Sequence, residues 1–205
     1  MLITISREFG AGGSSLAKLV SERLGWRVVD NQLVEEVAAR AGTTPEEIRE
    51  REERAPTFGE RVARALTVAT PEMLTPTSVE LPEAEEMRLV RITEQVVAEA
   101  AVDHAVLVGR AASAVIGRRE DALHVKLVAS MAYRVAVIAR RDSITLDEAE
   151  KKLRDTDAHR ARYHRQYYNR DWSDPRSYHL TLNTEWLGLP RCAAIVVAAV
   201  EQKGD

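Results

Sequence analysis

The sequence is poor in cysteine and lacks long apolar runs, and both absences exclude classes of protein. With a single cysteine, Cys192, one chain has no internal disulfide. No apolar run reaches the roughly 18 residues of a membrane-spanning helix, and no segment has the hydrophobic core of a secretory signal peptide. We therefore expect a cytoplasmic protein without a membrane partner. Because apolar residues follow Cys192, we expect it to be a buried packing residue rather than a nucleophile.

The chain also has little net charge and no metal-binding histidine pattern. The formal charge of −3 over 205 residues gives no general attraction to nucleic acid, so any phosphate binding must depend on locally placed basic residues. The five histidines do not combine with cysteine or carboxylates at metal-ligand spacings. The length is that of one ordinary domain with a sizeable core.

What the sequence does contain is a strand, a glycine-rich turn and a helix within its first 24 residues. The β-branched run of residues 2–6, LITIS, has the length of a buried parallel strand. Glycines at 10, 12 and 13 leave room for backbone N–H groups to surround an anion, and apolar residues then recur at helical spacing. A loop that opens onto a helix N-terminus is typical of a phosphate site. The alternative is that these glycines only form a tight turn.

The loop resembles a Walker A motif, G-x-x-x-x-G-K-[ST], in layout but not in every residue. Gly13 stands where the lysine belongs, and Arg7 occupies the position of the first glycine. We expect the loop to bind ATP phosphates, and we expect Ser15 to supply the hydroxyl that binds Mg²⁺. Arg7 is a candidate source of the missing positive charge. The predicted ATP-binding residues are Gly10, Ala11, Gly12, Gly13, Ser14 and Ser15.

The rest of the chain alternates between short apolar runs and amphipathic stretches. Further strands are predicted at residues 26–29, 105–108, 123–129 and 178–182, with helices between them and at the C-terminal end. This alternation predicts an α/β fold of three layers, in which helices cover both faces of a central parallel sheet. The segment 70–82 carries three prolines and is expected to be a long irregular connection.

Several motifs in the right order resemble the cytidylate kinase-like family of P-loop nucleoside monophosphate kinases. They are ITISREFGAGG, VVDNQLV, VLVGR, HVKLVASMAYRV, DAHRARY and YHLTLNT. The resemblance implies a P-loop NTPase-type fold and transfer of a phosphoryl group from ATP, with Mg²⁺, to CMP or dCMP. It implies one domain that acts as a monomer or homodimer. Its core would comprise residues 1–30, 104–140 and 177–205, with an acceptor-binding helical insert at about 31–103 and a helical basic lid at about 141–176.

The lid would supply the cations that phosphoryl transfer needs, because charge spreads over the oxygens of the group in flight. Arginines are dense between 134 and 170, and Arg160 matches the family pattern D-x-x-R-x-x-Y. With Arg7, we expect Arg154, Arg160 and Arg162 to act in catalysis. The alternative is a solvated helix with internal ion pairs, since acidic residues are interspersed.

The resemblance places the acceptor near Asp30, Arg110, Arg134 and Asp157. Asp30 is equally well placed to be a helix cap. The family motif glycine–arginine–aspartate ends here in Ala111, which puts the preference for base and sugar in doubt.

Three functions remain open from the sequence. The first is an active kinase, for CMP or for another small phosphate acceptor. The second is a nucleotide-binding pseudoenzyme, since the Walker lysine is missing. The third is a nucleic-acid- or protein-binding module that uses the basic lid and its aromatic residues. The net acidity of the chain counts against the third, and we expect no nucleic-acid partner.

Overall fold

A five-stranded parallel sheet forms the centre of the computed structural model, which describes residues 1–48, 85–101 and 104–203. The strand order is β2-β3-β1-β4-β5, and every neighbouring pair is parallel. This confirms the predicted parallel sheet. The strands are β1 (Leu2–Arg7), β2 (Arg27–Val29), β3 (Ala105–Val108), β4 (Ala122–Val128) and β5 (Leu180–Asn183).

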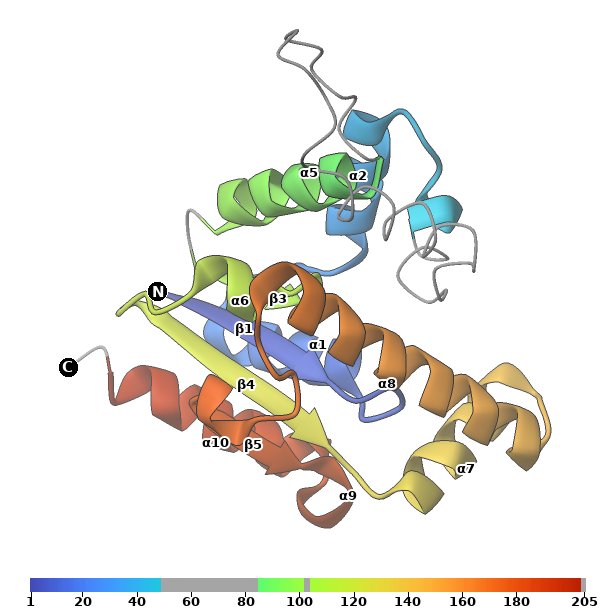
Figure 1. The fold of residues 1–205 in the computed structure, drawn as a ribbon. Helices are drawn as coiled ribbons and strands as arrows, with labels where there is room; N and C mark the ends of the chain where they lie inside the picture. Colours follow the sequence, from blue (N-terminus) through green and yellow to red (C-terminus); the bar gives the residue numbers. More distant parts are fainter. Residues whose placement is uncertain (49–84, 102–103, 204–205) are drawn as a thin grey trace, which may run out of the picture.

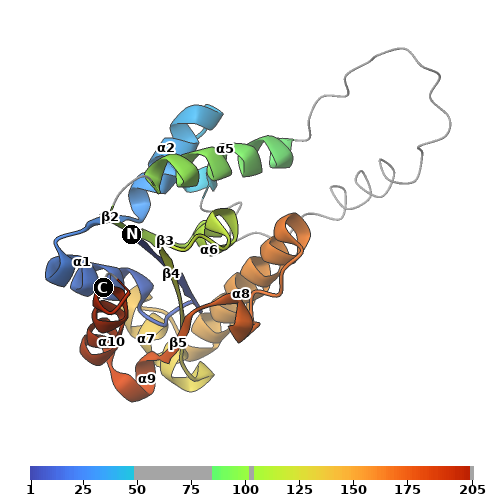
Figure 2. The same ribbon diagram turned by 90° about the vertical axis from the view of Figure 1, so that its left-hand side faces the viewer.

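One face of the sheet is apolar and is covered by α1 (Gly13–Leu24) and α10 (Leu189–Glu201). Ile3 and Ile5 of β1 point to this side and pack with residues such as Val20 and Val196. Figure 2 shows α1 and α10 on the left of the strands, while α6 (Ala112–Ile116) and α8 (Leu146–Tyr168) lie on the right. Cys192 is completely buried in this layer, as predicted, and its burial raises the pKa of the thiol.

The opposite face of β1 and β4 is polar although it is buried. Alternate residues of a strand point to opposite faces, so Thr4, Ser6, His124 and Lys126 share the side under α6 and α8. Each of the four side chains is at most 9% exposed. Burying polar side chains costs free energy, so a sheet selected for stability alone would be apolar on both faces. A buried polar face therefore marks the side of the sheet that carries the site.

Helices α2 (Asn31–Ala41) and α5 (Glu85–Ala100) pack together beside β2 and β3, at the upper edge of the ribbon in Figure 1. Arg40 joins them through two bonds to the Glu99 carboxylate, at 2.9 and 2.6 Å. A further helix begins at residue 45, where Thr44 and Glu47 cap each other. The predicted irregular segment 70–82 lies outside the described residues.

Helix α7 (Met131–Asp142) follows the carboxyl end of β4 and lies almost entirely within the predicted core segment 104–140. Helix α8 spans most of residues 141–176, for which a basic lid is predicted. A capping box of Thr145 and Glu148 starts α8, and Asn169 ends it in a left-handed conformation. The short η1 (Pro175–Ser177) and α9 (Thr184–Leu187) then flank β5. Among the described helices, none combines the length and apolarity needed to span a bilayer.

Candidate functional site

The glycine-rich loop joins β1 to α1 at the carboxyl edge of the sheet. Gly10 and Gly12 both adopt φ +85°, which is the left-handed conformation that favours glycine. Gly12 precedes the first turn of α1, and no side chain caps that turn. The amide groups and positive dipole end of α1 are therefore directed towards the loop. This arrangement is suited to an anion such as phosphate.

The Arg7 side chain lies across the position where the Walker lysine would begin. A Cβ atom at Gly13 would come within 2.9 Å of Arg7 Cγ, and one at Gly109 would overlap Arg7 Nη1. Glycine at both positions is thus needed to let the arginine pass between α1 and the end of β3. The Arg7 side chain also lines a cavity, but none of the predicted ATP-binding residues 10–15 lines it. That Arg7 supplies the missing charge stays a prediction.

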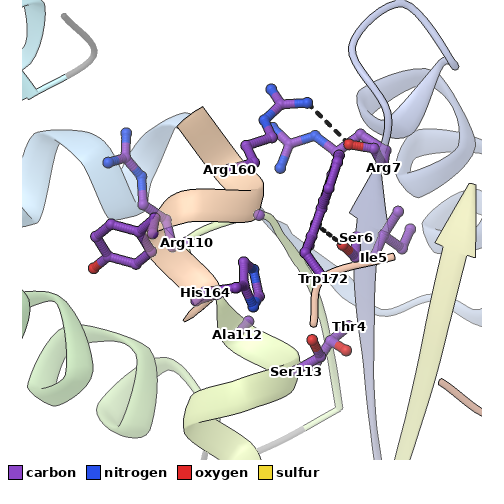
Figure 3. Close-up of a pocket in the computed structure, with 13 residues that line it drawn as sticks. Thr4, Ile5, Ser6, Arg7, Arg110, Ala112, Ser113, Arg160, His164 and Trp172 are labelled. Atoms are coloured by element: carbon purple, nitrogen blue, oxygen red, sulfur yellow. Dashed lines mark hydrogen bonds between the residues drawn. The ribbon is translucent and has the colours of Figure 1, made fainter. Parts of the chain in front are cut away.

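Three arginines from distant parts of the chain line one cavity of about 70 Å³. Arg7 comes from the end of β1, Arg110 follows β3, and Arg160 lies on α8. Arg160 Nη1 donates to the carbonyl oxygen of Arg7 at 2.9 Å, which fixes α8 against the start of the loop (Figure 3). Figure 3 shows the guanidinium groups of Arg7 and Arg160 close together, whereas that of Arg110 points away from them. The two neighbouring groups favour a ligand with several negative charges, such as phosphate.

Arg110 is presented by a left-handed turn. Gly109, Arg110 and Ala111 have φ values of 78°, 51° and 48°, so two consecutive non-glycine residues adopt a conformation that costs roughly 1–2 kcal/mol each. Strained backbone of this kind is concentrated at functional sites. The turn keeps the Arg110 side chain against the cavity, where it is only 9% exposed.

Arg134 and Asp157, both predicted to bind substrate, instead bind each other and the loop. Arg134 Nη1 donates to Asp157 Oδ2 at 2.6 Å and to the Phe9 carbonyl at 3.1 Å, while Asp157 Oδ1 accepts from the Phe9 amide at 2.8 Å. Glu8 lies 3.4 Å from Arg134 Nε. Neither Arg134 nor Asp157 lines the cavity. Their placement indicates that they hold the loop, and a direct substrate contact stays a prediction.

The other predicted site residues lie apart from the cavity. Arg154 is exposed and pairs with Glu150 one turn earlier on α8, as in the alternative of a solvated helix, and Arg162 is also exposed. Their catalytic roles stay predictions.

Asp30 does not cap α2 with its side chain, so that alternative is wrong. It accepts a 2.6 Å bond from the hydroxyl of Ser14 instead. Counted from Gly13, the Walker spacing assigns the hydroxyl position to Ser14 rather than Ser15.

Sequence reasoning missed a buried polar network beneath the cavity. The Trp172 indole N–H donates to Ser6 Oγ at 3.0 Å, and its carbonyl accepts from Lys126 Nζ at 3.1 Å and from the Tyr178 hydroxyl at 3.0 Å. Burial lowers the pKa of Lys126 to about 7. The signal was present in the alternation of residues 123–127, Leu-His-Val-Lys-Leu, which places two polar side chains on one face of β4.

The glycine loop at the end of β1, the order of the parallel strands and the helices on both faces define the three-layer α/β fold of P-loop kinases. More particularly, the chain belongs to the cytidylate kinase-like family, whose profile matches residues 2–186. Family and fold together support a phosphotransferase that acts on nucleotides.

Two curated relatives are both called cytidylate kinase. The protein of Natronomonas pharaonis is 28% identical over 201 residues, which is 98% of this chain and 89% of that protein. The protein of Methanosphaerula palustris is 39% identical over 84 residues, which is 40% of this chain. This second match spans only 48% of the M. palustris protein, about half its length.

Solved structures resemble the fold at low sequence identity. An uncharacterized protein from Eubacterium ventriosum has a TM-score of 0.70 at 16% identity, with 98% of each chain covered. Shikimate kinase from Acinetobacter baumannii, solved with shikimate, has a TM-score of 0.54 at 14% identity, with 98% of this chain and 93% of that chain covered. At such identities the likeness concerns the fold alone.

Proposed function

We propose that this protein transfers the γ-phosphoryl group of ATP to a nucleoside monophosphate, with CMP and dCMP as the first candidates. The observation that carries the proposal is the cavity lined by Arg7, Arg110 and Arg160 beside the glycine-rich loop. Phosphoryl transfer is catalysed chiefly by positioning and by cations that stabilise charge on the transferred oxygens. The cavity offers such cations from three separate elements.

In this proposal the loop residues 10–15 surround the donor phosphates with backbone N–H groups, and Arg7 replaces the Walker lysine. Arg160 bridges the two substrates, because its side chain reaches the cavity from α8 and is bonded to the backbone of Arg7. Arg110 binds the acceptor phosphate from the opposite wall. The described helices of the insert, α2 and α5, and the lid at about 141–176 enclose the two substrates and exclude water.

The loop also offers oxygen atoms that fit Mg²⁺. The hydroxyl of Ser14 and the carboxylate of Asp30 are bonded at 2.6 Å, and the hydroxyl of Ser15 is on the next residue. Mg²⁺ commonly uses only one or two protein oxygens together with substrate phosphates and water. When bound, the ion would neutralise charge on the donor phosphates. Ser14, Ser15 and Asp30 would hold it, which leaves Arg7 and Arg160 to contact the transferred group.

The replacement of the Walker lysine by Gly13 favours a second candidate, a nucleotide-binding pseudoenzyme. Such a protein binds ATP but does not accelerate transfer. Ala111 in place of the family's aspartate favours a third possibility, an active kinase for another small phosphate acceptor. An assay of ADP release, together with calorimetric measurement of ATP binding, separates the three.

The assay is acceptor-dependent ADP release, measured with ATP and Mg²⁺ and with CMP, dCMP, UMP, AMP, GMP or no acceptor. We expect release with CMP or dCMP. Release with a different acceptor would correct the substrate, and calorimetric ATP binding without any release would support the pseudoenzyme.

The matched variants are Arg160→Ala and Arg165→Ala, which remove arginines from the same helix inside and outside the cavity. Loss of one group that stabilises transition-state charge typically lowers turnover about 10²- to 10³-fold. We expect this of Arg160→Ala, while Arg165→Ala, exposed on α8, keeps its turnover. Equal turnover in the two variants would contradict the role of Arg160.

A further inference from the structure

The cavity continues past the three arginines to a less charged end that the proposed function leaves unexplained. Thr4, Ser113 and His164 line this end together with the apolar side of Trp172. Figure 3 shows Arg7 and Arg160 at one end, Thr4 and Ser113 at the other, and His164 between them. One water molecule needs roughly 10–15 Å³ of such space. By this measure the cavity of about 70 Å³ has room for several waters, or for a small ring in their place.

His164 is one of two residues lining this cavity, with Ser113, that have a buried polar atom without a partner among the described residues. Its side chain is 5% exposed, and its Nδ1 atom is buried without a hydrogen-bond partner among the described residues. A buried polar atom left unpaired costs roughly 1–3 kcal/mol, so nearly all such atoms in proteins have a partner. The ring is held by packing at 6.1 Å from Tyr168 and 6.5 Å from Trp172, measured between centroids.

The imidazole of His164 is also neutral. Burial, together with the positive charges of Arg170, Lys126 and Arg160, lowers its pKa to about 3. In a neutral imidazole one ring nitrogen donates and the other accepts a hydrogen bond. Burial makes a charged partner costly at this depth, so an uncharged partner is favoured. The same positive charges disfavour a ligand that carries a protonated amine at this depth.

We infer that this end of the cavity binds the non-phosphate part of the acceptor, and that His164 Nδ1 selects an acceptor whose inserted ring carries an uncharged hydrogen-bonding group. The inference rests on the proposed function, because the arginines at the mouth would hold the acceptor phosphate. His164 is a specificity-determining residue in this scheme. It completes its own hydrogen bonding only when the acceptor is present.

Histidine substitution distinguishes the two ring nitrogens. The amide of asparagine reaches the position of Nδ1, the amide of glutamine reaches that of Nε2, and leucine offers neither. We expect His164→Leu to raise the KM for CMP at least tenfold while the KM for ATP stays unchanged. We expect His164→Asn to restore most of the CMP affinity and His164→Gln to restore little. The matched control is His159→Leu on the same helix, since His159 does not line the cavity.

The ¹⁵N chemical shift of Nδ1 in wild-type protein gives a second readout that does not depend on folding of a variant. We expect the Nδ1 resonance of His164 to move on addition of CMP and to stay in place on addition of ATP. If CMP binds and moves the resonance but no ADP is released, the proposed function fails and the inference stands.

If CMP is phosphorylated while the resonance is unmoved and His164→Leu keeps the wild-type KM, the inference fails and the proposed function stands. Equal CMP affinity for the leucine and asparagine variants would also overturn it. Absence of binding by CMP, dCMP, UMP, AMP and GMP would overturn both.

Discussion

The ion pair of Arg134 and Asp157 is expected to hold the glycine-rich loop against the lid helices, and breaking it should destabilise the protein markedly. The two side chains are 6% and 18% exposed, and the pair is 2.6 Å long. Removing one partner of a buried pair costs roughly 3–5 kcal/mol, because the other charge stays buried. Glu8, at 3.4 Å from Arg134, compensates part of that charge when Asp157 is removed. We therefore expect about 3 kcal/mol for Asp157→Ala.

A double-mutant cycle with Arg134→Met and Asp157→Ala measures the pair itself. Each single variant leaves a buried charge, whereas the double variant leaves neither, so its loss should be smaller than the sum by about 2 kcal/mol. Urea unfolding followed by circular dichroism gives the free energies. Since Asp157 and Arg134 bond the amide and carbonyl of Phe9, the single variants should also raise the KM for ATP.

The control is Arg141→Met, which breaks an exposed pair with Asp142 in the same region. Exposed pairs typically contribute about 0.2–1 kcal/mol. Additive losses in the cycle, or a loss from Asp157→Ala no larger than that of the control, would refute the argument that this pair holds the loop.

Two further predictions concern buried charge and backbone strain. Lys126→Met should increase the free energy of unfolding at pH 7 by at least about 1 kcal/mol. Each unit by which burial lowers the pKa of Lys126 corresponds to about 1.4 kcal/mol. The Trp172 carbonyl still accepts a hydrogen bond from Tyr178 in the variant. The pKa of Lys126 in the folded protein lies below that in the unfolded chain, so the wild type gains stability as the pH rises from 7 to 10.5. The stability advantage of Lys126→Met, measured by urea unfolding, should therefore shrink over this range. A difference in unfolding free energy that stays constant with pH would contradict this account. Ala111→Gly should stabilise the protein by up to about 1 kcal/mol, since glycine adopts φ 48° without strain, and an unchanged or lower melting temperature would count against strain at this turn.

The strands and the glycine-rich loop could be predicted from the sequence because both depend on neighbours in the chain. The run of residues 2–6 and the glycines that follow it specify their local conformation by side-chain periodicity and by steric freedom. The strand predicted at 178–182 was displaced by two residues at its start, since β5 begins at Leu180. Ends of elements depend on tertiary contacts, here the packing of Tyr178 under the cavity.

The roles of individual polar residues depended on partners far away in the chain. Asp157 was expected to bind substrate, yet it bonds Phe9, which lies 148 positions earlier. Asp30 was a possible cap for the helix that follows it, yet it bonds Ser14. A carboxylate satisfies its hydrogen bonds with whichever donors the fold brings near, and local sequence does not specify these donors.

The sequence by itself determined the order of strands and helices along the chain, the glycine-rich loop and the absence of the Walker lysine. Each of these features depends only on residues that are close together in the chain. Only the tertiary structure decided which arginines share a cavity. Arg7, Arg110 and Arg160 meet there, while Arg134 is drawn into a buried pair and Arg154 remains on the surface. The physical reason is that the role of each arginine depends on how deeply its side chain is buried and on which groups surround it. Both are determined by the tertiary structure.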